Sequence, residues 1–99
     1  MPTRLSALVA AAVVSACATA PPSAVVLEPG FDRFGGDYHG FDLAEPDPGL
    51  CANACVMDVS CRAFAYVKPG VAARTARCFK KNVRPERTPN NDCTSGVVR

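Results

Sequence analysis

Three of the six cysteines lie within eleven residues, in the stretch CANACVMDVSC from Cys51 to Cys61. Cysteines this close together can act as redox thiols, as zinc ligands or as halves of structural disulfides. A redox pair is typically C-x-x-C at the start of a helix, and a zinc site usually includes a close pair among four ligands. The spacing C-x3-C-x5-C fits neither pattern. It therefore favours disulfides, provided that the chain enters an oxidising compartment.

The N-terminus predicts such a compartment. One cation, Arg4, precedes a ten-residue apolar run from Leu5 to Val14, and small residues follow, as in a secretory signal. This run is too short to span a membrane, which takes about 20 apolar residues. The motif VSAC, which ends at Cys17, resembles a bacterial lipobox and implies a lipid on the Cys17 thiol. The alternative is an ordinary signal peptide that is cut a few residues later, after ATA.

We therefore expect a lipoprotein signal peptide at 1–16, a lipidated cysteine and short tether at 17–24, and one domain at 25–99. A lipid, and not a membrane span, would anchor the chain. Ala18 is not Asp, which in similar lipoproteins favours the outer membrane, with the domain facing the periplasm or the cell surface. The mature chain, residues 17–99, is small enough for its core to be marginal without disulfides.

The middle of the chain changes from a strand pattern to a helix pattern. Two glycines at 35 and 36 predict a turn, and the residues 37–43 predict a short strand. Asp47 is a good N-cap and Pro48 suits the first helical position, so a helix is predicted to begin there. Its expected apolar stripe consists of Leu50, Ala54 and Met57.

The second half predicts strands and loops. Residues 61–68 alternate between two apolar sets, which predicts a central strand, and a Pro-Gly turn opens a loop at 69–76. A second strand is predicted at 77–83, a loop at 84–92 from two prolines and two asparagines, and an edge strand at 93–99. These elements predict an α+β domain, with one helix packed on a small antiparallel sheet.

The predicted helix limits how the cysteines can pair. Cys51 and Cys55 are four residues apart, so both face the same side of the helix. A bridge between these two would be strained, whereas each can reach the sheet. Cys61 begins the next strand within reach of Cys55, and Cys78 in the neighbouring strand can meet Cys51.

The motifs GFDL, CANACVMDVSCRAFAYV, RCFKK and SGVV resemble the PAN/Apple domain family in its compact bacterial form, and the resemblance covers Phe31 to Arg99. It implies a small disulfide-stapled fold in which a curved antiparallel sheet cradles one helix, tied by Cys51–Cys78 and Cys55–Cys61. Many eukaryotic relatives carry a third disulfide that joins the chain ends. Here the only cysteine upstream of the first pair is Cys17, so Cys93 is expected to be unpaired or linked to another chain.

The resemblance also implies a function, because domains of this family bind proteins or carbohydrates and carry no catalytic machinery. We expect a non-catalytic module with a protein or glycan ligand, and we expect no catalytic residues, metal, cofactor or nucleic acid. The one histidine, His39, has no nucleophile motif near it and is expected to be an exposed turn residue. The alternative is a structural or accessory subunit of an envelope complex that has no soluble ligand.

Charge is divided unevenly along the chain. Residues 28–58 contain seven acids and one base, and residues 62–99 contain nine bases and two acids. The basic half could meet a polyanion, and its candidate ligand contacts lie in and beside the loop from Lys68 to Arg77. These candidates are Lys68, Arg74, Arg77, Lys80, Lys81 and Arg84. The alternative is that the two halves fold against each other and neutralise their charges.

Overall fold

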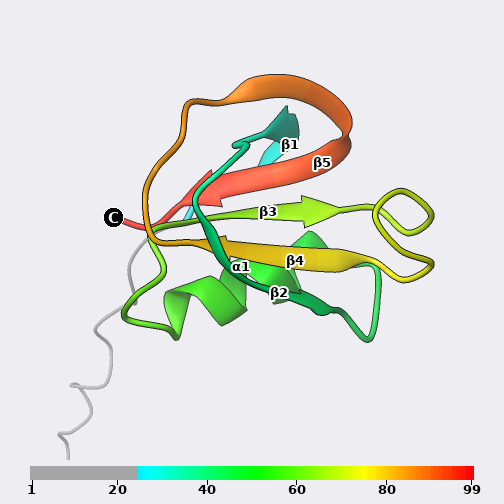
Figure 1. Ribbon diagram of the computed structural model, residues 1–99, viewed down its shortest axis with the longest axis horizontal. Coiled ribbons are helices and arrows are strands. Elements are labelled where there is room, and N and C mark those ends of the chain that lie inside the picture. The colour runs from blue at the N-terminus through cyan, green and yellow to red at the C-terminus, as the bar shows by residue number, and fades with distance from the viewer. Residues whose placement is uncertain (1–24) are drawn as a thin grey trace, which may run out of the picture.

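The computed structural model describes residues 25–99 and contains one helix packed on a five-stranded antiparallel sheet (Figure 1). The α+β fold predicted from the sequence is confirmed. The elements are β1 (Glu28–Asp32), β2 (Asp37–Asp42), α1 (Pro48–Val56), β3 (Ala63–Val67), β4 (Arg77–Lys81) and β5 (Thr88–Val97). The strand order is β1-β5-β3-β4-β2. The predicted signal peptide, the lipidation of Cys17 and the tether lie outside the described residues.

The helix begins where its capping residues predict. The Asp47 side chain accepts a hydrogen bond of 2.8 Å from the Gly49 N–H, and Pro48 occupies the first turn. The helix is too short to cross a membrane, and no described helix is long and apolar enough to do so.

The predicted apolar stripe of the helix is wrong. Met57 is 76% exposed and Leu50 is 40% exposed, while Cys51, Ala52 and Cys55 form the buried side. The physical reason is that both helical cysteines are bonded to residues outside the helix, at Cys78 and Cys61. These bonds turn the cysteine side toward the sheet, and the neighbouring stripe is left facing outward.

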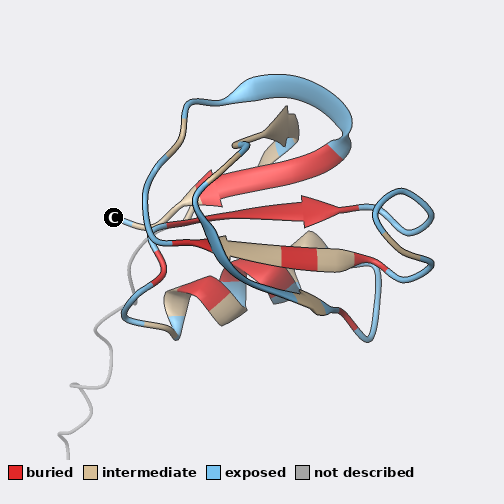
Figure 2. Cartoon of the chain, in the orientation of Figure 1, coloured by how far each residue is buried: buried red, intermediate tan, exposed pale blue. Residues whose placement is uncertain are grey.

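Strand β3 is central, as predicted, and all five of its residues are buried (Figure 2). Its side chains alternate between the two faces of the sheet. Phe64 and Tyr66 belong to the core cluster with the helical cysteines and Cys78, whereas Ala63, Ala65 and Val67 face the opposite side. The main core therefore lies between the sheet and α1, and small residues line much of β3 on the helix-free face.

Two predictions for the C-terminal part of the chain are wrong. The predicted loop at 84–92 gives way to β5 at Thr88, and β5 is not an edge strand, since it lies between β1 and β3. The first half of β5 is exposed and pairs with β1 only, which explains its polar, loop-like sequence (Figure 2). Strand β1 contains Pro29 and Gly30, residues that are rare in strands, and it pairs through a bulge at which Gly30 has φ 82°.

Two close contacts hold the outer part of the sheet. The Arg33 guanidinium donates two hydrogen bonds of 2.9 Å to the Glu28 carboxylate, and the Ser95 hydroxyl donates to the same carboxylate at 2.8 Å. This arrangement ties β1 to β5. Across β5 and β3, Gly96 pairs with Phe64, and a Cβ added at Gly96 would lie 2.6 Å from the Phe64 ring. Only glycine therefore leaves room for this ring.

Candidate functional site

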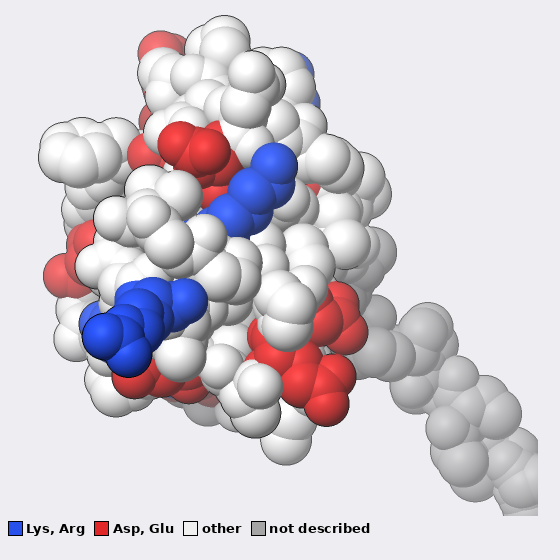
Figure 3. Space-filling model, turned by 90° about the vertical axis from the view of Figure 1, so that its right-hand side faces the viewer, with Lys and Arg blue, Asp and Glu red and all other residues white. Residues whose placement is uncertain are grey.

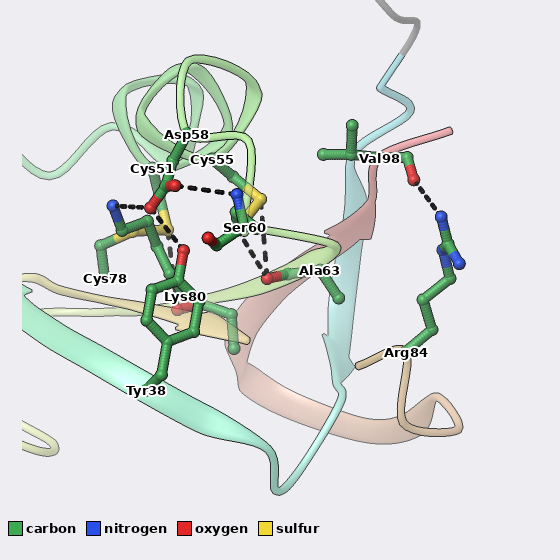
Figure 4. Close-up of a disulfide and its surroundings, with 12 residues drawn as sticks. Tyr38, Cys51, Cys55, Asp58, Ser60, Ala63, Cys78, Lys80, Arg84 and Val98 are labelled. Atoms are coloured by element: carbon green, nitrogen blue, oxygen red, sulfur yellow. Dashed lines mark hydrogen bonds and ion pairs between the residues drawn. A yellow bond between two sulfur atoms is a disulfide. The ribbon is translucent and has the colours of Figure 1, made fainter. Parts of the chain in front are cut away.

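The helix-side cysteines form structural disulfides and are not a reactive centre (Figure 4). Cys51 is bonded to Cys78 with a Cα–Cα distance of 5.3 Å, and Cys55 is bonded to Cys61 with a Cα–Cα distance of 5.2 Å. These are the two pairs that the resemblance implies. Both distances lie in the range usual for disulfides, and all four residues are buried.

Cys93 has no disulfide partner among the described residues, and it lies on the helix-free face of the sheet. Its side chain is buried. Burial, and then the charges of Asp32 and Asp92, raise the pKa of the Cys93 thiol to about 11. The thiol is therefore protonated at neutral pH and is a poor nucleophile. Its burial also keeps it from another chain, unless β5 moves.

Three of the six candidate cations are paired with acids from the first half of the chain. The pairs are Arg77–Asp42 at 2.8 Å, Lys80–Asp58 at 2.8 Å and Lys81–Asp37. All three cations belong to β4, and two of the acids belong to β2, the strand that pairs with β4. Sheet pairing therefore brings the acidic and the basic halves of the chain together, and the two neutralise each other here.

The other three candidate cations lie apart from this set. Lys68 and Arg74 are exposed in the β3–β4 loop, and the Arg84 guanidinium donates a 2.8 Å hydrogen bond to the Val98 carbonyl (Figure 4). Figure 3 faces the end of the molecule that carries this loop. Lys and Arg gather there in two separate places, each with Asp or Glu beside it. The structure therefore does not bring the six cations together on one surface.

A polar cluster links β2, β4 and the turn after α1 (Figure 4). The Asp58 carboxylate accepts hydrogen bonds from Lys80 Nζ at 2.8 Å, from the Tyr38 hydroxyl and from the Ser60 N–H at 3.0 Å. These bonds, led by the one from Lys80, hold the pKa of Asp58 well below its usual range. Desolvation, and then Asp58, raise the pKa of Tyr38 to about 12. The cluster fixes the helix end to the sheet.

We predict that acid weakens the fold through this cluster. The folded pKa of Asp58 lies below the value of about 3.9 in an unfolded chain. Ionised Asp58 therefore stabilises the fold above about pH 4, and this contribution is lost as the pH falls from about 4 through the lower folded pKa. Asp58→Asn removes the ionisation and keeps the shape. In urea unfolding from pH 6 to pH 2, the difference in the free energy of unfolding between wild type and variant should shrink. A constant difference would show that the ionisation of Asp58 does not cause the acid sensitivity.

A pocket of about 330 Å³ lies on the helix-free face of the sheet. Its apolar lining comes from β3 and β4, from the β1–β2 loop and from the β3–β4 loop. These residues are Phe34, Ala65, Val67, Val71, Ala72 and Phe79. Ala65 pairs directly with Phe79, so a small residue and a large ring stand side by side on this face. The short side chain of Ala65 leaves the room that a bulky residue would fill.

Charged and polar groups line the same pocket. They come from the ends of β1 and β2, from β4 and from β5, and they are Asp32, Asp37, Lys81, Asn90 and Cys93. The Lys81 side chain is only 3% exposed, yet it carries an ammonium group that contacts Asp37 and donates a 3.2 Å hydrogen bond to the Gly35 carbonyl. A buried charge is costly unless it is paired, so the Asp37 contact accounts for its presence.

The sequence pattern did not predict most of this pocket, and Lys81 is the one lining residue among the candidate ligand contacts. The pattern that could have found it is the alternation in β3, where Ala63, Ala65 and Val67 put small side chains on one face. Small residues on a central strand leave the sheet surface hollow. The contributions of Phe34 and Asn90 depend on the β1–β2 loop and on β5, and neither could be placed without the sheet order.

His39 does not line the pocket, and the described residues hold no metal site. His39 is exposed, but it lies in β2 and not in a turn, with its ring 5.1 Å from that of Phe41. Among residues 25–99, no group of three or more His, Cys, Asp or Glu side chains is placed to hold a metal ion. A concave pocket that combines apolar and a few polar side chains has the usual form of a binding site.

Comparison with known proteins supports the family that the sequence resembles. The sequence model of the PAN domain matches residues 31–81, just over half of the chain. The searches of curated proteins and of solved structures found no match. PAN domains are generally modules that bind proteins or carbohydrates, and they are typically non-catalytic. With its helix, its antiparallel sheet and its two disulfides, this chain belongs to the PAN domain family.

Proposed function

We propose that this protein is a non-catalytic binding module whose ligand, a protein segment or a glycan, occupies the pocket on the helix-free face. The observation that carries the proposal is the pocket of about 330 Å³, which combines apolar side chains with the buried Lys81 ammonium. Binding sites are usually concave and apolar, with a few fixed polar groups that orient the ligand. The general binding role of PAN domains supports the same conclusion.

Two exposed side chains at this pocket support binding rather than a purely structural role. Phe34 is 84% exposed and Val71 is 54% exposed, although both line the pocket. A large exposed ring beside a cavity gains free energy when a ligand covers it, and aromatic residues often dominate the energy of binding. The helix side of the domain also carries exposed apolar residues.

These helix-side residues favour a second candidate, an accessory subunit of an envelope complex. Met57 is 76% exposed and Val59 is 98% exposed, close together in the chain after α1. Such residues could contact a partner subunit across a surface without any pocket. The two candidates use opposite faces of the sheet, so one pair of variants distinguishes them.

The test compares Phe34→Ala with Met57→Ala in the purified protein. Both residues are largely exposed, so each change should alter the free energy of unfolding by less than about 0.5 kcal/mol. The probes are a panel of methyl glycosides and a panel of short synthetic peptides, with binding followed by NMR shifts. We expect Phe34→Ala to weaken binding of the active probe by at least about tenfold, and Met57→Ala to leave it unchanged.

The opposite results have distinct meanings. Binding that Phe34→Ala leaves intact would refute the pocket as the ligand site. Binding that Met57→Ala abolishes would place the ligand on the helix side instead. If no probe binds the wild type, the accessory subunit without a soluble ligand is favoured.

We further propose that a lipid on Cys17 displays this module at the cell envelope, in the outer membrane, facing the periplasm or the cell surface. The lipobox-like motif VSAC after a short apolar run supports this proposal. We expect the intact mass of the mature protein to correspond to residues 17–99 plus lipid, and Cys17→Ser to abolish the lipid. A mass without lipid, or cleavage after residue 20, would favour the ordinary signal peptide.

A further inference from the structure

We infer that the pocket takes an uncharged saccharide unit and discriminates against acidic sugars. This inference rests on the proposed function, because it names the ligand class of the same pocket. It also departs from the polyanion expected from the charge of the second half of the chain. The first argument is electrostatic. The charged groups that line the pocket are two carboxylates, Asp32 and Asp37, and one ammonium, Lys81.

An anionic ligand meets like charges in this pocket. It approaches Asp32 and Asp37, and the one cation beside them is already paired with Asp37. Like charges a few ångströms apart at low dielectric cost more than a solvated surface pair does. An uncharged sugar avoids this penalty.

The second argument concerns hydrogen-bonding capacity. A lysine ammonium has three N–H donors, and Lys81 Nζ uses one toward the Gly35 carbonyl and one toward Asp37. Within residues 25–99, the third donor has no acceptor, although the side chain is only 3% exposed. Buried donors are normally satisfied, so an oxygen of a ligand is a suitable partner.

Acceptors line the same pocket as this donor. The Asp37 carboxylate is 45% exposed, and the Asp32 carboxylate uses Oδ1 to accept the Arg33 N–H at 2.7 Å, which leaves Oδ2 available. Asn90 adds an amide, whose oxygen accepts the Asp92 N–H at 2.9 Å and whose NH₂ remains available. A hydroxyl group both donates and accepts, so neighbouring hydroxyls of one sugar ring match this mixed set.

The third argument is the apolar part of the pocket. Phe79 and the exposed Phe34 present aromatic rings, and Ala65 leaves the surface between the polar groups hollow. The C–H groups of a pyranose ring form an apolar face, and the negative face of an aromatic ring attracts such weakly positive edges. A saccharide therefore offers hydroxyls and an apolar face together, which is the combination that this pocket presents.

The experiment compares sugars that differ only in charge. The purified full-length protein is titrated with methyl β-glucopyranoside, methyl β-galactopyranoside and methyl β-N-acetylglucosaminide, and with the uronic-acid forms of the first two. We expect at least one neutral glycoside to shift the amide signals of Ala65, Phe79 and Cys93. Its uronic-acid counterpart should bind at least about tenfold more weakly.

Asp32→Asn is the diagnostic variant. Asn keeps an oxygen that can accept the Arg33 N–H, so we expect the fold to be retained, which circular dichroism checks. Removal of this charge should reduce the difference in affinity between a neutral glycoside and its uronic acid. The affinity for the neutral glycoside should change little.

The outcomes separate the inference from the proposed function. A uronic acid that binds as well as the neutral sugar, or better, overturns the inference, and so does the absence of shifts with every sugar tested. If peptides alone bind and Phe34→Ala weakens them, the inference fails and the proposed function stands. If Phe34→Ala weakens no ligand that binds, the proposed function fails as well.

Discussion

Replacing Cys51 and Cys78 together by alanine is expected to lower the free energy of unfolding by about 3–4 kcal/mol. This disulfide has a sequence separation of 27 residues, and it fastens α1 to β4. Without it, the unfolded chain gains the conformational freedom of a long loop, which is the main stabilising effect assigned to disulfides. Small domains often have only about 5 kcal/mol of stability, so the variant should keep only about 1–2 kcal/mol and unfold at a much lower urea concentration. Urea unfolding of both proteins measures the change.

Two control variants keep this prediction specific. The Cys55–Cys61 disulfide has a separation of only 6 residues, so its loss should cost less, about 2 kcal/mol. Cys93→Ala also removes a buried sulfur, but it breaks no bond that the structure describes. It should therefore cost clearly less than either pair. Equal losses in all three variants would show that burial, and not the cross-links, accounts for the stability.

Phe64→Ala is expected to cost about 3–5 kcal/mol, which is typical of a large aromatic residue removed from a core. Phe64 is fully buried, belongs to the central strand and packs on the helix side of the sheet. Gly96 approaches this ring so closely that no side chain is available to fill the space left behind. A cavity should therefore remain, and its cost adds to the lost burial of the ring.

Phe34→Ala provides the matched control, because it removes the same ring from a position that is 84% exposed. Its effect on stability should be near zero, whereas its effect on ligand binding should be large. Thermal unfolding of the two variants tests this contrast. If Phe64→Ala unfolds at the same temperature as Phe34→Ala, the assignment of the core to the helix side of the sheet is wrong.

Local chemistry made the centre of the fold predictable. Asp47 and Pro48 set the helix start through capping and a fixed backbone angle, which need no distant partner. The alternation in β3 and the cysteine spacings likewise act over a few residues. In the outer part of the sheet, long-range pairing determines the structure. Strand β1 contains Pro29 and Gly30, and it becomes a strand because β5 lies beside it and Glu28 binds Arg33 and Ser95.

The candidate site was harder to predict, because it depends on which distant residues become neighbours. Lys81 looks like a free cation in the sequence, but its pairing with Asp37 follows from the register of β2 against β4. The outward turn of Met57 follows from the disulfides, because helical periodicity alone does not say which side of a short helix will be fixed to the sheet. Charge and periodicity describe single segments, whereas the pocket is lined by residues of five strands and two loops.

The position of β5 has a consequence for how the chain folds. Of the five strands described, β5 is synthesised last, and it lies between β1 and the central strand β3, so the sheet cannot be completed until residues 88–97 are available. Until then, β3 and β1 lack the partner that β5 gives them, and such unpaired strand edges favour aggregation. The contacts between β1 and β5 join residues about 60 positions apart, which slows folding. The complete sheet can therefore form only after β5 has emerged.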